Sequence, residues 1–165
     1  MHRALLLALL PLTACASAQA PAQVPAYEAI AFDINSWGRP MGSWEVQADG
    51  TVSHLKIEGS VFNAHKVEHR KFTVDAAAYA KLAALAARLP QPRLTRDGCK
   101  ERATDLPYGT LSLTRGGAEE EVRFDLGCLD AAYQAFFGQL RAMDDLVGAW
   151  ADDHPATSVE EVGRN

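Results

Sequence analysis

The first part of the chain alternates between apolar and polar residues, the pattern of strands that are buried on one face. The segment 30–34 (IAFDI) alternates in this way, and a further strand is predicted over 65–74. Between them, Asp49-Gly50 separates two alternating runs, and this dipeptide is typical of a two-residue hairpin turn. Such a turn predicts one mostly apolar face that consists of Trp44, Val46, Ala48, Thr51, Ser53, Leu55 and Ile57.

Two later segments have the helical period instead. Asp75 is a favourable N-cap for a helix over 76–89, whose apolar residues fall on one stripe. Asp130 precedes a longer amphipathic pattern of the same kind. Between the helices, alternation on both sides of Gly116-Gly117 predicts a second hairpin. The predicted order is ββββαββα, an α+β fold in which a mainly antiparallel sheet of about six strands carries two helices on one face.

The chain of 165 residues has the length of one domain, and its 48% of hydrophobic residues is typical of a globular protein. The segment 15–26 is small, polar and proline-containing, as expected of a tether. The segment 152–165 has little apolar periodicity and is predicted to be a loose polar tail. A single folded domain is therefore expected over 27–151.

The N-terminus has the character of an export signal. Arg3 precedes an apolar run over 4–10, which is far shorter than the roughly 20 residues of a membrane span. The sequence Leu12-Thr13-Ala14-Cys15 then resembles the lipobox of bacterial lipoproteins. The resemblance implies that 1–14 is a signal peptide and that the Cys15 thiol takes a diacylglycerol, which anchors the protein in a lipid bilayer. The alternative is a secreted or soluble periplasmic protein that is cleaved after 16–18.

The resemblance also implies which membrane of the cell envelope holds the anchor. Ala16, and not Asp, follows the lipidated cysteine, and by the usual sorting rule this implies an outer-membrane lipoprotein that faces the periplasm.

The three cysteines are consistent with an oxidising compartment. Lipidation uses Cys15 and leaves Cys99 and Cys128 as an even pair, for which we expect a disulfide. Two unpaired buried thiols are the alternative.

Charge and motifs exclude several functions. The net charge of −5 and the lack of a Lys/Arg patch argue against a nucleic-acid partner. The sequence lacks the nucleophile elbow, the phosphate-binding loop, the dinucleotide fingerprint and the C-x-x-C pair. His65 and His69 match the H-x-x-E-H pattern of inverted zinc peptidases, but on a strand they stand about 13 Å apart. We therefore expect no metal, no cofactor and no assignable catalytic residue.

Two loops offer a candidate ligand surface. Trp37 and Arg39 lie in the predicted loop 36–42, with Trp44 just after it, and could form an aromatic rim for a glycan or a peptide. Asp105 and Tyr108 lie in a turn between the two cysteines, where a disulfide would brace them. The alternatives are a loop that tucks one tryptophan over the sheet edge and a plain proline turn.

These features together favour a membrane-anchored, non-enzymatic binding or interaction lipoprotein whose ligand is unknown. Two alternatives remain open at this point. One is a small envelope hydrolase with an unrecognised site. The other is an inhibitor of an envelope enzyme that offers the loop 97–109 to a target cleft.

The lipobox generates a direct test. We expect Cys15→Ser to release the protein from membranes and to abolish fatty-acid labelling, because the substitution removes the thiol that would carry the lipid. Membrane fractionation and labelling with a radioactive fatty acid measure both effects. A Cys15→Ser protein that still sediments with membranes would contradict the anchoring hypothesis.

Overall fold

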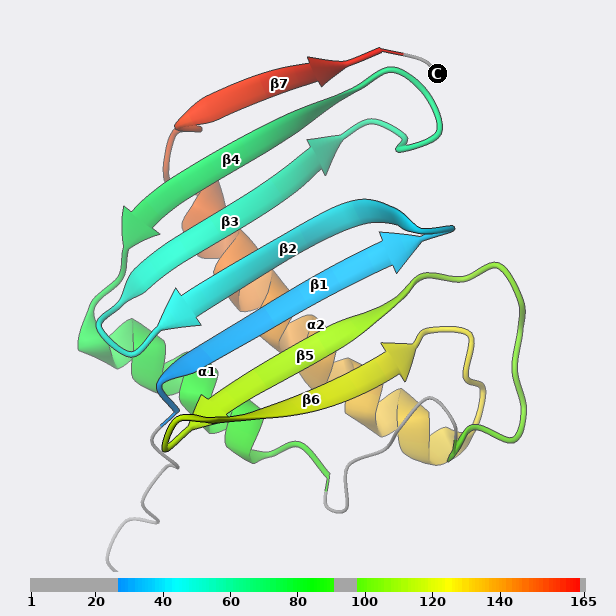
Figure 1. Cartoon of the computed structure of the whole chain (residues 1–165). Helices are drawn as coiled ribbons and strands as arrows, with labels where there is room; N and C mark the ends of the chain where they lie inside the picture. Colours follow the sequence, from blue (N-terminus) through cyan, green and yellow to red (C-terminus); the bar gives the residue numbers. More distant parts are fainter. Residues whose placement is uncertain (1–26, 91–97, 164–165) are drawn as a thin grey trace, which may run out of the picture.

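The computed structural model of the protein describes residues 27–90 and 98–163 (Figure 1). The predicted signal peptide, Cys15 and the predicted tether lie outside the described residues. The described residues form seven strands and two helices, so the α+β class is confirmed, and the sheet has seven strands where about six were predicted. The strands are β1 (Ala29–Ser36), β2 (Arg39–Gln47), β3 (Thr51–Glu58), β4 (His65–Thr73), β5 (Tyr108–Arg115), β6 (Ala118–Asp125) and β7 (Ser158–Val162).

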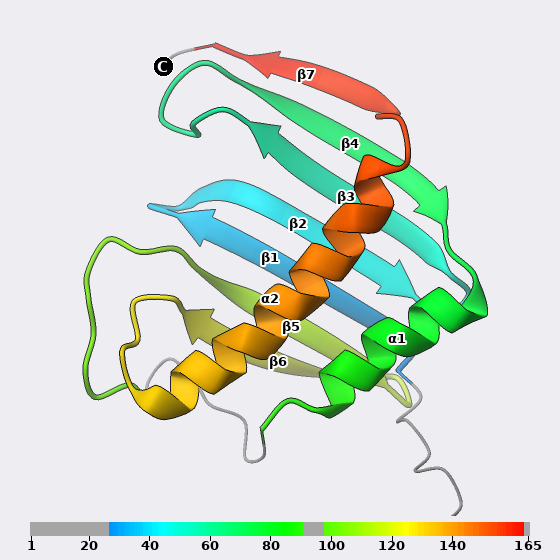
Figure 2. The ribbon, with the colours of Figure 1, turned by 180° about the vertical axis from the view of Figure 1, so that it is seen from behind.

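All neighbouring strands pair antiparallel in one sheet of order β6-β5-β1-β2-β3-β4-β7. Helices α1 (Ala76–Ala87) and α2 (Ala131–Asp152) both cover the same face of this sheet, and α2 crosses it diagonally (Figure 2). The two helices on one face are as predicted. Neither helix of the described part combines the length and the apolar character that a membrane span requires.

The seventh strand corrects the prediction of a loose tail over 152–165. β7 pairs with β4 at the edge of the sheet, and Thr157 donates its backbone N–H to the His69 carbonyl at 2.7 Å just before β7 begins. The side chains of β7 are mostly exposed, and two of its five residues are glutamates. β7 is held by its backbone hydrogen bonds to β4. Because its side chains lie mostly in solvent, its sequence has no apolar periodicity.

The β2–β3 hairpin has a different register from the predicted one. Val46 pairs with Val52, so the loop contains Ala48 as well as Asp49 and Gly50. Gly50 has φ +88°, and a Cβ there would collide with the Val74 carbonyl oxygen. Three-residue hairpin loops commonly place a glycine at such a left-handed position.

This shift by one residue reverses the faces of β3, because side chains alternate with a period of two. Val52, His54 and Lys56 share the helix-covered face with Trp44 and Val46, whereas the predicted face contained Ser53 and Leu55. Polar side chains of β3 therefore lie beneath α2, which the sequence did not lead us to expect.

The core lies between the sheet and the two helices. Phe32 on β1 stacks on Trp44 on one side and on Phe124 on the other, with ring centroids 5.5 and 5.4 Å apart. The buried stripe of α2 covers these rings and consists of Tyr133, Phe136, Phe137, Leu140, Met143, Val147 and Ala151.

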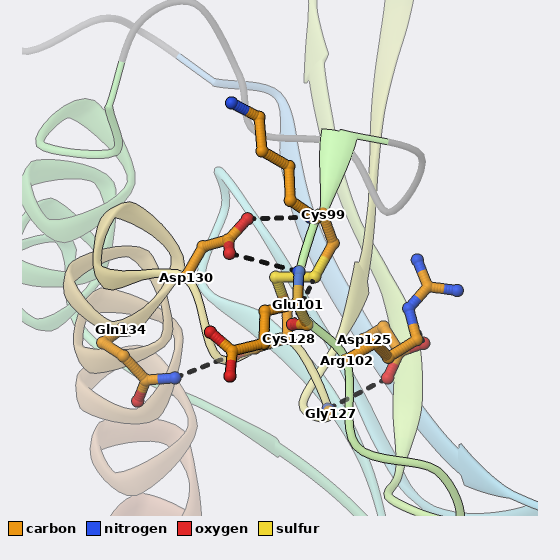
Figure 3. Close-up of a disulfide and its surroundings, with 9 residues drawn as sticks. Cys99, Glu101, Arg102, Asp125, Gly127, Cys128, Asp130 and Gln134 are labelled. Atoms are coloured by element: carbon orange, nitrogen blue, oxygen red, sulfur yellow. Dashed lines mark hydrogen bonds and ion pairs between the residues drawn. A yellow bond between two sulfur atoms is a disulfide. The ribbon is translucent and has the colours of Figure 1, made fainter.

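The predicted disulfide between Cys99 and Cys128 is present (Figure 3). It joins the segment before β5 to the turn between β6 and α2. Asp130, at the N-cap position of α2, makes no side-chain bond to the helix. Its carboxylate instead accepts the backbone N–H groups of Lys100 and Glu101, at 2.9 and 3.3 Å. The disulfide and Asp130 thus fix the same loop to the start of α2.

Candidate functional site

Three of the five residues predicted to form a ligand surface meet around one cavity. Trp37, Asp105 and Tyr108 line a cavity of about 430 Å³ at the end of the sheet where β1 finishes and β5 begins. We call this cavity the Trp37 pocket. Its further wall residues include Arg102, Thr104, Leu106 and Asp125.

Trp37 occupies an unfavourable backbone position. It forms a two-residue turn with Gly38 between β1 and β2, and both residues have positive φ, 52° and 73°. A left-handed conformation is strained for a bulky L-residue and costs about 1–2 kcal/mol. The β5–β6 hairpin makes the corresponding turn with Gly116 and Gly117, at φ 59° and 72°, without that strain. Trp37 is also 68% exposed, so most of its surface lies in water and not in the core.

Tyr108 holds the turn in place. Its hydroxyl oxygen accepts the Gly38 backbone N–H at 3.1 Å, although Tyr108 belongs to β5. The register reinforces this contact, because Asn35 of β1 pairs with Tyr108. The indole of Trp37 is therefore carried by a turn that is fixed to the neighbouring strand.

Asp105 and Leu106 come from the loop before β5. Among the described residues, Trp37 and Asp105 are the two non-glycine residues with positive φ, and that of Asp105 is 67°. Aspartate tolerates this conformation better than most residues. Leu106 is exposed, and the Thr104 hydroxyl donates to the Asp105 carboxylate at 3.4 Å. The loop thus contributes an acidic and an apolar residue to the lining of the same pocket as Trp37.

The disulfide-linked loop supplies the remaining polar wall. Arg102 Nε lies 3.7 Å from Asp125 Oδ2, and Arg102 forms a backbone bridge with Cys128 (Figure 3). Asp125 is buried, and its Oδ1 accepts the Gly127 backbone N–H at 3.0 Å. The Cys99–Cys128 bond therefore fixes the segment that carries Arg102.

Arg39 and Trp44 lie away from this pocket. The Arg39 guanidinium donates to the Val61 carbonyl at 2.8 Å and lies 5.7 Å from the centre of the Phe62 ring. Trp44 is only 3% exposed and lies on the helix-covered face. The predicted loop 36–42 is in fact a tight turn, because β2 already begins at Arg39.

A second cavity, which the sequence did not indicate, lies between α2 and strands β2 and β3. We call it the α2 groove. It has a volume of about 410 Å³, and its polar lining includes Trp44, His54, Lys56, Asp144 and Asp152. Trp44 Nε1 donates to Asp144 Oδ1 at 2.9 Å, and Lys56 Nζ lies 2.9 Å from Asp152 Oδ1.

The α2 groove contains three titratable groups whose pKa values depart from the ordinary ones, His54, Asp144 and Asp152. Burial raises the pKa of the Asp144 carboxyl, although the bond from Trp44 opposes this effect. Burial also lowers the pKa of His54, and the positive charge of Arg70 lowers it further. His54 Nδ1 is buried without a hydrogen-bond partner. Because titratable groups with perturbed pKa values are typical of functional sites, an enzymatic reaction would be placed in this groove.

The histidines of the peptidase pattern lie on a strand, as predicted. His65 and His69 both belong to β4, where they pair with Val162 and Ser158 of β7. In the described part of the chain, one group of three metal-ligand side chains comes together, and it consists of Cys99, Cys128 and Asp130. The disulfide occupies both sulfur atoms of that group. The absence of a bound metal remains a prediction.

The half-buried Asp144 carboxyl generates a pH-dependent prediction. A pKa that is higher in the folded than in the unfolded protein means that ionisation of Asp144 destabilises the fold. This destabilisation is complete above the folded-state pKa and disappears as the pH falls below the unfolded-state pKa. We therefore expect Asp144→Asn, whose amide oxygen still accepts the Trp44 bond, to be more stable than the parent at neutral pH and equally stable near about pH 3.

Urea unfolding at both pH values measures this difference. Glu119→Gln, which removes an exposed carboxylate on β6 far from this groove, corrects for the altered net charge. A stability gain of Asp144→Asn that is the same at both pH values would contradict the burial argument.

Comparison of the chain with protein-family models, with curated proteins and with solved structures finds no match in any of the three, and the geometry of the two cavities is therefore the ground for a functional proposal.

Proposed function

We propose that this protein is a non-enzymatic binding protein of the bacterial cell envelope, whose ligand occupies the Trp37 pocket. In this proposal the acylated Cys15 anchors it in the outer membrane, on the periplasmic side. The observation that carries the binding function is the placement of Trp37.

Trp37 is unfavourable for the fold in two respects. The turn would be more stable with Asn-Gly or Gly-Gly, since those pairs adopt positive φ without strain. An exposed indole also leaves apolar surface in water, where it gains nothing from the core. Strained residues of this kind gather at functional sites, where the surrounding structure holds them in place. A ligand that covers the indole explains a tryptophan at this position.

The walls of the Trp37 pocket are held in place before any ligand arrives. The Tyr108 hydroxyl accepts a hydrogen bond from the turn that carries Trp37, and Asp125 pairs with Arg102. The Cys99–Cys128 disulfide fixes the segment that carries Arg102. A site that is already ordered loses less conformational entropy on binding. This rigidity supports recognition by a fixed surface.

The position of the pocket agrees with an anchor at the N-terminus. The described chain begins at Tyr27, beside the start of β1, and Trp37 directly follows the end of β1. An eight-residue strand is roughly 26 Å long. An anchor that precedes Tyr27 would therefore attach at the end of β1 opposite to the pocket.

The α2 groove supports the alternative of a small envelope hydrolase, because Asp144 and His54 line it together. The inhibitor alternative has less support, since the described part of the loop, 98–107, forms the wall of a concavity. Binding at the Trp37 pocket remains the function that the geometry favours.

Trp37→Asn tests the proposal through two effects of opposite sign. We expect the variant to be more stable than the parent by about 1 kcal/mol, because asparagine adopts the left-handed conformation more easily. This gain corresponds to a rise in melting temperature of about 3–4 °C. We expect the same variant to lose retention on delipidated cell-envelope material, because the indole that contacts the ligand is gone.

The full-length protein in mild detergent is suited to both measurements, with calorimetry for stability and co-sedimentation for retention. Phe62→Asn is the matched control, since Phe62 is another exposed aromatic residue that lies outside the Trp37 pocket. Equal retention of Trp37→Asn and the parent would rule out the Trp37 pocket as the binding site.

A further inference from the structure

We infer that the ligand of the Trp37 pocket is a neutral oligosaccharide, with one sugar ring stacked on the indole of Trp37. This inference rests on the proposed binding function and specifies the chemistry of the ligand.

The walls of the pocket match the two surfaces of a sugar ring. A pyranose ring presents C–H groups on its faces and hydroxyl groups around its edge, so it needs a flat apolar partner and polar partners at right angles to it. Trp37 offers an exposed aromatic face of this kind. Asp105 and Thr104 supply acceptors and a hydroxyl, and Arg102 supplies donors.

The charge of the pocket favours a neutral ligand. Asp125 already neutralises Arg102, and Asp105 adds a further negative charge. A phosphate or an acidic sugar would therefore face a carboxylate without an excess of positive charge. Sugar hydroxyls, in contrast, donate to a carboxylate and accept from a guanidinium without carrying charge themselves.

A peptide fits this site less well. Peptides commonly bind by adding a strand to a sheet edge, and the edge strands of the sheet are β6 and β7. The Trp37 pocket lies at the end of the β1–β2 hairpin, where β1 and β2 are central strands. The edges themselves carry glutamates at 119–121 and 160–161, which oppose further strand pairing.

A lipid chain also fits poorly. The large apolar side chains of the pocket are those of Trp37 and Leu106, and both are exposed rather than enclosing a cavity. Acyl chains need a deep apolar enclosure to be removed from water.

Titration of the full-length protein with defined oligosaccharides tests this inference. The protein is kept in a zwitterionic detergent without a sugar headgroup, and binding is followed by calorimetry and by tryptophan fluorescence. Chitotetraose stands for an N-acetylglucosamine polymer and laminaritetraose for a glucan, so the two arms separate the possible sources. An uncharged tetrapeptide is the third ligand.

We expect saturable binding of at least one tetrasaccharide and none of the tetrapeptide. Trp37→Asn should weaken this binding by at least about tenfold, since it removes the stacking face. Asp105→Gly should also weaken it, and glycine adopts the positive φ of this position without strain. Phe62→Asn should leave the affinity unchanged.

Two results would overturn the saccharide inference and leave the proposed binding function intact. One is Trp37-dependent retention on envelope material without binding of either tetrasaccharide. The other is Trp37-dependent binding of the tetrapeptide alone. Saccharide binding that is equal in Trp37→Asn and the parent would overturn the assignment of the site itself. If retention on envelope material is also independent of Trp37, the proposed function fails as well.

Discussion

Three aromatic rings hold the middle of the sheet together. Phe124, Phe32 and Trp44 stack in a row beneath α2, although β5 lies between the strands that carry Phe124 and Phe32. The row is continuous because β5 has Gly109 at this point. A Cβ there would lie 2.7 Å from the Phe124 ring and would also collide with the Asp33 carbonyl oxygen. The stack therefore joins β2, β1 and β6 across β5.

Both cavities depend on this arrangement. At one end of the strands, the alignment of β1 with β5 brings Tyr108 to the turn that carries Trp37. Beneath α2, the last ring of the stack, Trp44, donates to Asp144 and so forms part of the α2 groove. The same row of rings thus supports both the turn that carries Trp37 and the position of Trp44 in the α2 groove.

The sequence predicted the elements of this fold better than their pairing. Hydrophobic periodicity identified both helices and six of the strands, because each of these elements buries one face. It could not identify β7, which is held by backbone bonds and has exposed side chains. It also placed His54 and Lys56 on the wrong face of β3, since a single residue in the β2–β3 loop decides the register.

The candidate site was predicted only in part, because the sequence does not show which distant residues the fold brings together. Trp37 stood out in the predicted loop 36–42, and Asp105 and Tyr108 stood out in a turn between the two cysteines. The structure brings the three residues together. Arg102 and Asp125 are 23 positions apart, and only the folded disulfide loop shows that they are ion-paired partners. Trp44 resembled Trp37 in sequence context, yet strand alternation turns it toward α2 and into the core.

The indole N–H resonances of Trp37, Trp44 and Trp150 provide the most direct test of the claim that the Trp37 pocket, and not the α2 groove, is the binding site. The full-length protein is labelled with ¹⁵N-tryptophan and titrated with soluble oligosaccharides and peptides released from the cell envelope. The account predicts that the Trp37 resonance shifts and that Trp44, whose N–H is bonded to Asp144 on the covered face, stays in place. A shift of Trp44 with Trp37 unchanged would contradict the account and would assign binding to the α2 groove.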